Sequence, residues 1–256
     1  QERKRAEPGV HRNNDGSECR GVIDGQRFGY MVSITLDAEH EFADESFQCE
    51  GLFSPPAEGE GWEVLLDNPG SLQIWRKRIP ETSVYEYKTI GIATAPSAEV
   101  WVKVAFMDLE YHKQWDVNCI DIEPIKVEDA VTGVEWVYWE VKYPWPMSNR
   151  DYVYARKHLV KDGIHYIRSR AKAHPLKPEE KSKVRVELYR CNAAVRGAGN
   201  GRCEYGSIAV DDPKVLLPSS IVNYFIAKTL PAAMASMEIA CGKYEEWKLA
   251  HLQKSG

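Results

Sequence analysis

The chain has 256 residues, of which 43% are hydrophobic and 28% are charged, a balance typical of a globular protein. Its formal net charge of −5 argues against nucleic acid as the main partner, because phosphate binding needs a basic surface. No run of about 18 apolar residues is present, so the sequence offers no candidate membrane-spanning helix.

The N-terminal part of the chain is polar. Gly residues and an Asn-Asn-Asp-Gly run predict a flexible leader over residues 1–35, ahead of one folded domain over residues 36–254. The opening QERKRAEPGV has no apolar core and is therefore not a signal peptide. The segment Glu39–Phe53 then predicts a short amphipathic helix, which SPPAEGEG ends.

From Trp62 onward, short segments rich in β-branched and aromatic residues are separated by turn signals, which predicts strands. Three strands come first, in WEVLLD, SLQIWRKR and SVYEYKTIGI. APSAEVWVKVAFMD then predicts a helix that starts at Pro96 or Ser97, and LEYHKQWD predicts a second short helical piece. Six further strands follow, in NCIDIEPIKVED, GVEWVYWEVKYP, RDYVYARKHLV, IHYIRSRAKAH, KVRVELYRCNAAVR and CEYGSIAVDD.

The chain closes with a long helical pattern. Ser219 or Ser220 can cap it, apolar residues recur at helical spacing as far as Cys241, and Pro231 kinks it. Helices that are segregated from hairpin-linked strands predict an α+β fold with one antiparallel sheet of about nine strands. One face of such a sheet must be buried, and we expect the terminal helix to cover it.

The six cysteines are scattered without the spacing of a metal site. We interpret them as reduced thiols of a cytoplasmic protein and expect neither a metal ion nor a cofactor.

Aromatic residues crowd the segment Val137–Lys157. Strand alternation places Val137, Trp139, Val141 and Tyr143 on one face, and Trp136, Tyr138, Glu140 and Lys142 on the other. The second face carries charge, so we expect it to meet solvent or an edge. The first face fits either a ligand pocket or plain core, and periodicity leaves both readings open.

A family resemblance bears on this choice. YWEVKYPWPMSNRDYVY, with EYHKQWD upstream and P..IVNYFIAK..P downstream, resembles the START lipid-transfer domain family, and within it the phosphatidylcholine transfer branch. The resemblance runs from about Glu39 to Tyr244. It implies a helix-grip fold, in which a curved antiparallel sheet surrounds a lipid tunnel and the C-terminal helix is the lid. It also implies one lipid per tunnel and no covalent chemistry.

The resemblance also implies site residues. The family's choline-cage positions fall on Trp139, Val141, Tyr152 and Tyr189, and aromatic rings suit a quaternary ammonium that cannot donate a hydrogen bond. The family's phosphate-binding arginine falls on His112, and its acidic partner falls on Asp116. Phe106 matches a pocket-lining position. Each has a simpler reading: Asp116 as a helix cap, His112 as a surface side chain and Phe106 as core.

Two further expectations follow for residues near this site. Arg150 and Asp151 are expected to form a structural ion pair, because a buried arginine needs a partner. In the lid helix, Leu230, Met234 and Met237 are expected to face the acyl chains, where methionine suits varied ligands. Leu216, Leu217 and Tyr224 are candidates for bilayer contact.

Our hypothesis is a cytoplasmic, monomeric carrier that binds one phospholipid and touches membranes transiently. Phosphatidylcholine is the first candidate, followed by phosphatidylethanolamine and then by sterol or ceramide. A lipid-sensing regulatory or scaffold module is the alternative. An enzyme is disfavoured, because no nucleophile motif, G-x-G-x-x-G or Walker sequence is present.

Overall fold

The computed structural model describes residue 42 and residues 51–126, 133–215 and 219–254. The chain divides into two compact units, Gln1–Glu41 and Phe42–Gly256, and the second is described here. The expected leader lies outside the described residues, as does the expected helix over Glu39–Phe53 apart from Phe42 and residues 51–53. Leu216, Leu217 and the side chain of Tyr224 are likewise outside them.

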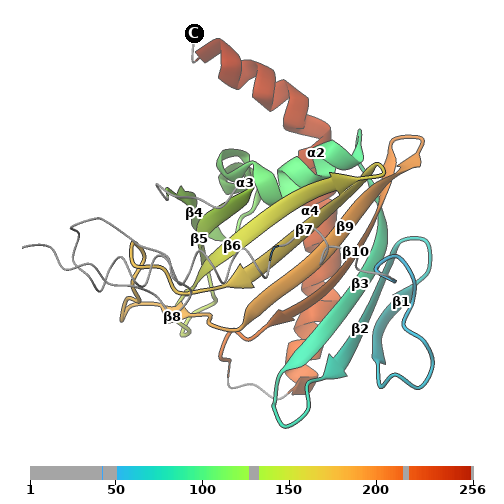
Figure 1. Ribbon diagram of the computed structural model, residues 1–256, viewed down its shortest axis with the longest axis vertical. Helices are drawn as coiled ribbons and strands as arrows, with labels where there is room; N and C mark the ends of the chain where they lie inside the picture. Colours follow the sequence, from blue (N-terminus) through green and yellow to red (C-terminus); the bar gives the residue numbers. More distant parts are fainter. Residues whose placement is uncertain (1–41, 43–50, 127–132, 216–218, 255–256) are drawn as a thin grey trace, which may run out of the picture. The chain divides into compact units, whose positions relative to one another are not determined.

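One sheet dominates the described part of the chain (Figure 1). Its strands are β1 (Glu63–Asn68), β2 (Leu72–Arg78), β3 (Tyr85–Thr94), β4 (Cys119–Ile125), β5 (Val134–Val141), β6 (Arg150–Lys161), β7 (Ile164–Ala171), β8 (Val184–Arg185), β9 (Tyr189–Gly199) and β10 (Arg202–Asp211). The order across the sheet is β1-β2-β3-β10-β9-β7-β6-β5-β4, and all these pairs are antiparallel. Two-residue β8 pairs with β6 in parallel.

The strand count is close to expectation, with one difference. KVRVELYRCNAAVR is two elements, β8 and β9, separated by residues 186–188. The alternation of apolar and polar residues continues from β8 into β9. The sequence alone therefore did not reveal that β8 pairs with β6, whereas β9 pairs with β7 and β10.

Three helical elements connect β3 to β4. They are α2 (Ala98–Val102), the π-helix η2 (Lys103–Met107) and α3 (Leu109–Trp115). The predicted start is confirmed, because the Ser97 hydroxyl oxygen accepts a hydrogen bond from the Val100 N–H at 3.1 Å. Asp108 caps α3 in the same way, through the Tyr111 N–H at 2.9 Å.

The terminal helix α4 spans Ser219–Lys254 and contains Pro231. It contacts α2, η2, α3 and the strands β1 and β3. The covering of the sheet is therefore shared, because α2 also contacts β7, β9 and β10, and α3 contacts β4. No helix in the described part of the chain is long and apolar enough to cross a bilayer.

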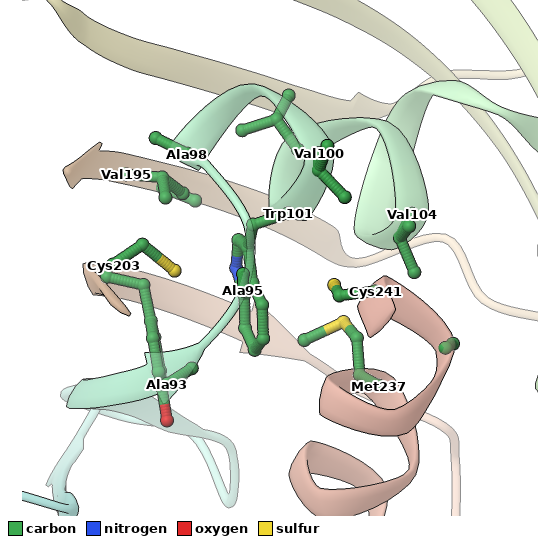
Figure 2. Packing of buried hydrophobic residues seen from close by; sticks show 14 of the residues in the cluster. Ala93, Ala95, Ala98, Val100, Trp101, Val104, Val195, Cys203, Met237 and Cys241 are labelled. Atoms are coloured by element: carbon green, nitrogen blue, oxygen red, sulfur yellow. The ribbon is translucent and has the colours of Figure 1, made fainter. Parts of the chain in front are cut away.

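The core lies where α2 and α4 meet the sheet (Figure 2). Trp101 of α2 is almost fully buried and stacks on Tyr205 of β10, with ring centroids 5.3 Å apart. Met237 and Cys241 of α4 approach it from the other side. These contacts fix the second half of α4 to the sheet.

Polar contacts strengthen the same attachment. The Tyr111 hydroxyl donates to the carbonyl of Ala240 at 2.8 Å, and the Tyr244 hydroxyl donates to the Asp108 carboxylate at 2.9 Å. The Tyr111 ring also packs against Tyr244 and Trp247. The stretch of α4 that contains these residues is thus tied to α3.

Candidate functional site

Three aromatic rings meet on the inner face at one end of the sheet. Trp139 of β5 pairs in register with Tyr152 of β6, and their ring centroids lie 5.2 Å apart. Tyr189 of β9 meets Tyr152 edge-on at 5.5 Å. Trp139 and Tyr189 are only partly buried, so their rings remain available to another molecule. The structure thus brings these three expected cage residues together.

Val141 follows Trp139 on the same face and is also half-buried. Both residues pack against a small cluster of buried apolar side chains: Ile122, Val137, Tyr152, Tyr154 and Val186. On the inner face of β5, the Val137 side chain is therefore buried, whereas Val141 at the end of the strand is partly exposed.

An acidic residue that the sequence did not single out completes the cluster. Asp211 ends β10, pairs in register with Tyr189, and shares the inner face with Tyr205 and Ala209. The Tyr152 hydroxyl donates to both its carboxylate oxygens, at 3.1 and 3.2 Å. Burial raises the pKa of Asp211 to about 7, although its side chain keeps a large exposed area. A pKa raised by burial in a residue that is still exposed is typical of a side chain on the wall of a concave site.

His112 of α3 lies against the cluster. Its ring meets Trp139 edge-on, with centroids 5.9 Å apart, and it is buried. His112 Nε2 is 3.2 Å from Asp116 Oδ2, while Nδ1 is buried and has no partner among the described residues. The reading of His112 as an ordinary surface side chain is therefore wrong.

Asp116 ends α3 and does two things. Its carboxylate faces His112 and also accepts the N–H of Asn118 at 2.9 Å. Burial raises the pKa of this carboxyl, but the bonds from His112 and Asn118 outweigh burial and hold the pKa below its usual value. A neutral His112 that donates from Nε2–H leaves Nδ1 as an acceptor, whereas the protonated ring donates from both nitrogens.

The expected ion pair between Arg150 and Asp151 is wrong, although both side chains are buried. Adjacent strand residues point to opposite faces, so the two cannot meet. Asp151 instead pairs with Arg185 of β8 at 2.8 Å. Arg150 donates to the carbonyls of Ser148, Pro213 and Lys214, and its guanidinium lies 4.3 Å from the centre of the Tyr143 ring.

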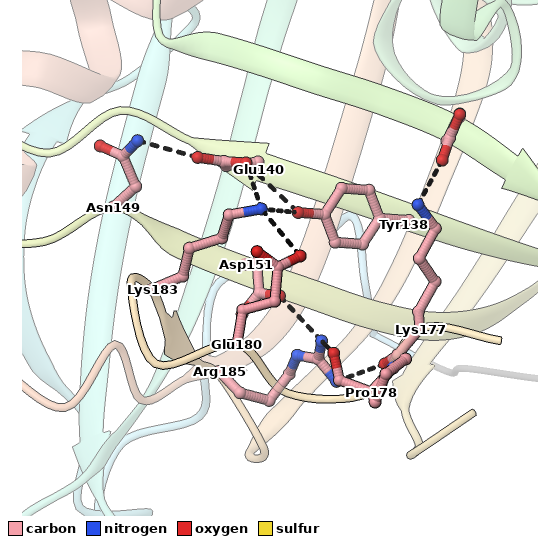
Figure 3. Close-up of polar contacts among 10 residues, drawn as sticks. Tyr138, Glu140, Asn149, Asp151, Lys177, Pro178, Glu180, Lys183 and Arg185 are labelled. Atoms are coloured by element: carbon pink, nitrogen blue, oxygen red, sulfur yellow. Dashed lines mark hydrogen bonds and ion pairs between the residues drawn. The ribbon is translucent and has the colours of Figure 1, made fainter. Parts of the chain in front are cut away.

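The other face of β5 was expected to meet solvent or an edge, and for most of its length this is wrong: Trp136, Tyr138 and Glu140 are buried. The segment 172–183, which precedes β8, covers them. Lys183 lies 2.9 Å from both the Tyr138 hydroxyl and the Glu140 carboxylate (Figure 3). Burial raises the pKa of Glu140, but hydrogen bonds from Lys183 and Asn149 hold it below its usual value.

The remaining predicted positions lie in or against the core. Phe106 is half-buried beside the main cluster, and its carbonyl accepts from the Arg156 guanidinium. Leu230 and Met234 are half-buried against that cluster, and Met237 is buried within it. No group of three metal-binding side chains occurs among the described residues.

A cavity of about 750 Å³ lies next to the aromatic cluster, between η2, α3 and the strands β4 and β5. Its apolar wall includes Met107, Leu109, Ile122, Val137 and Tyr244. It includes none of Trp139, Tyr152, Tyr189 and Asp211.

Comparisons with known proteins agree with this architecture. The START domain profile matches residues 48–248. Phosphatidylcholine transfer protein from Homo sapiens is 33% identical over 213 residues, 81% of this chain and 97% of the relative. The Bos taurus protein of that name is 31% identical over 211 residues, 80% of this chain and 96% of the relative. The crystal structure of human STARD10 superposes with a TM-score of 0.67 at 25% identity, covering 91% of this chain and 86% of that one. This chain therefore belongs to the START domain family.

Proposed function

We propose that this protein binds one phospholipid in a tunnel beneath its sheet and carries it between membranes, with phosphatidylcholine as the first candidate. The observation that carries the proposal is the cluster of Trp139, Tyr152 and Tyr189 on the inner face. Aromatic faces bind quaternary ammonium groups with about 0.5–2 kcal/mol per contact. The family and the names of the relatives support the same reading.

The proposal includes a membrane contact at the same end of the sheet. Trp145 is 92% exposed in the connection between β5 and β6, and Val117 is 89% exposed between α3 and β4. The Lys142 N–H donates to the Asn118 carbonyl at 2.8 Å, which joins these two connections. Ile120 is also exposed there. We call Val117, Ile120 and Trp145 the apolar rim. Exposed apolar side chains beside a lipid site suit a bilayer surface.

We further propose that the carrier works as a cytoplasmic monomer, without covalent chemistry or a cofactor. A lipid sensor would share the binding site, and an enzyme would consume the lipid, so transfer and recovery of intact lipid separate the three classes.

The test is transfer of labelled phosphatidylcholine between donor and acceptor vesicles. We expect catalytic transfer by the wild type, with the lipid recovered chemically unchanged. Trp139→Ala is expected to weaken choline-lipid binding by about 1–3 kcal/mol, because stacking and packing are both lost. Trp139→Phe keeps a ring and is the matched control. Binding without transfer would identify a sensor, and a Trp139→Ala protein that transfers at the wild-type rate would remove the cluster from the site.

A further inference from the structure

Asp211 sits among four tyrosines that come from different parts of the fold. Tyr152 of β6 donates to its carboxylate, and Tyr189 of β9 pairs with it across the sheet. Tyr87 of β3 and Tyr143 after β5 are near enough for its charge to raise their pKa values. Burial is the main cause that raises the pKa of each of these tyrosines, and the nearby Asp211 charge adds to it. The phenols therefore stay protonated near neutral pH and act as hydrogen-bond donors and aromatic faces.

This carboxylate lacks a cation. Among the described residues, no Lys, Arg or His lies within ion-pair distance of Asp211, and its direct polar contact is the Tyr152 hydroxyl. Two basic residues next to the segment that follows Asp211 are engaged elsewhere. Arg150 donates to three carbonyls, and Lys214 pairs with Glu187 at 2.8 Å.

Asp211 is exposed as a residue, but its carboxylate has a single hydrogen-bond donor, Tyr152, among the described residues. Removing a carboxylate from water is unfavourable unless an opposite charge or several donors replace the lost hydration. One phenol does not replace that hydration, and the raised pKa of Asp211 reflects the remaining free-energy cost of its charged form. An organic cation bound against the tyrosine and tryptophan rings would offset the lost hydration, because it is attracted both to the carboxylate and to the ring faces.

The opposite end of the cluster has no comparable charge for an anion. The position closest to Trp139 on α3 holds His112, a single imidazole already turned toward Asp116. Arginine would offer phosphate a two-pronged donor at any pH, which histidine does not. Arg150 is a fixed positive charge against the Tyr143 ring, but it donates to three carbonyls, so Asp211 is the charge beside the rings that lacks an ion-pair partner among the described residues. This favours the ammonium end of a zwitterionic headgroup.

We propose that Asp211 is the specificity-determining anion of the site, which selects phospholipids whose headgroup ends in an ammonium over anionic or uncharged ones. The inference rests on the proposed function. It adds that the headgroup is recognised mainly at its cationic end, by a carboxylate in addition to rings.

The inference predicts a pH dependence. The ionised form of Asp211 attracts the ammonium, and the carboxyl is ionised above its pKa of about 7. Binding of choline lipid should therefore strengthen as the pH rises from 6 to 8. The facing tyrosines have raised pKa values and keep their protons in this range, and the neighbouring Asp212 charge contributes to the raised pKa of Asp211. His112 contacts Trp139, so it needs its own control.

The experiment measures transfer of phosphatidylcholine and of phosphatidylglycerol between vesicles from pH 6 to pH 8. Asp211→Asn preserves shape and removes the charge. We expect about a tenfold loss for phosphatidylcholine, less than a twofold change for phosphatidylglycerol, and loss of the rise with pH. Asp212→Asn makes the same change in net charge one residue away. It should keep the preference for phosphatidylcholine and the rise with pH, with the midpoint moved downward because the Asp212 charge raises the pKa of Asp211. His112→Gln should keep the rise with pH.

A second variant tests the same group if Asp211→Asn does not fold. Tyr152→Phe keeps the ring but removes a hydrogen bond that lowers the pKa of Asp211. We expect the midpoint of the pH profile to move upward, which a purely structural effect would not produce. An Asp211→Asn protein with unchanged lipid preference and pH profile overturns this inference alone, as does a Tyr152→Phe midpoint that does not move. A wild type that binds and transfers no lipid overturns the proposed function together with it.

Discussion

At the residue scale, the proposed contact with a headgroup phosphate depends on His112. Its Nε2 is engaged with Asp116, and its buried Nδ1 has no partner among the described residues. A single imidazole nitrogen gives at most one hydrogen bond to a ligand oxygen, and it is a donor only in the protonated ring or in the other tautomer.

Replacing His112 by arginine tests this directly. His112→Arg should form a pair with Asp116 and offer phosphate a forked donor, which we expect to tighten phospholipid binding by about 5- to 30-fold. Lys113→Arg is the control, because Lys113 pairs with Asp121 at 2.6 Å on the adjacent position. Equilibrium binding of short-chain phosphatidylcholine is the measurement. Unchanged affinity would mean that position 112 does not face the phosphate.

The site shows which residues a sequence can reveal. Alternation along β5 predicts the face of Trp139, the family resemblance supplies Tyr152, and the register shows that the two residues are neighbours. Asp211 was not predicted as a site residue, because it lies in AVDDP, where an acidic pair before proline indicates a turn. The position of Asp211 beside the rings follows from its pairing with Tyr189 across the sheet. Contacts between distant strands leave no local pattern in the sequence.

At the element scale, the outer face of the sheet is more occupied than its charges suggested. Lys183, Tyr138 and Glu140 form a buried network because the segment 172–183 returns over β5. Charged residues at alternate strand positions predict a solvent-exposed face only where no other segment of the chain covers that face. Segment 172–183 has no regular pattern of its own, so this covering was not predictable.

A glycine in β10 marks another close approach to this face. A Cβ added at Gly206 would lie 2.0 Å from the carbonyl oxygen of Leu52, which is backbone and cannot rotate away. We expect Gly206→Ala to lower the free energy of unfolding by about 1–3 kcal/mol through overpacking. Gly197→Ala in β9 is the matched control, because nothing lies within 4 Å of its added Cβ. Chemical denaturation measures both, and equal stabilities would show that the 51–53 turn moves away freely.

At the scale of the whole second unit, the ring cluster, Asp211 and the apolar rim share one end of the sheet. Val117 and Trp145 lie in the connections beside β4 and β5, Ile120 lies at the start of β4, and Trp139 lies near the end of β5. A carrier with this arrangement can present its headgroup site to the bilayer from which the lipid leaves.

The rim gives a prediction that separates membrane contact from lipid binding. Trp145→Ala should reduce partitioning onto phosphatidylcholine vesicles by about tenfold, since a large side chain gains roughly 1.5–3 kcal/mol on full burial. Binding of a short-chain lipid below its micelle concentration should not change. Val160→Ala alters an exposed apolar residue near the other end of β6 and is the control. Vesicle sedimentation gives the answer, and equal partitioning of all three proteins would place the contact elsewhere.

The strand order has a consequence for how the protein is made. Thr94 of β3 pairs with Arg202 of β10, and all elements from α2 to β9 lie between them in the chain. A nascent chain leaving the ribosome therefore holds the hairpins of β1–β3 and of β4–β7 as separate pieces, each with an unpaired edge, until β10 emerges. Pairing across such sequence distances slows folding and leaves those edges open to aggregation meanwhile. Synthesis of the last quarter of the chain joins the two halves into one sheet.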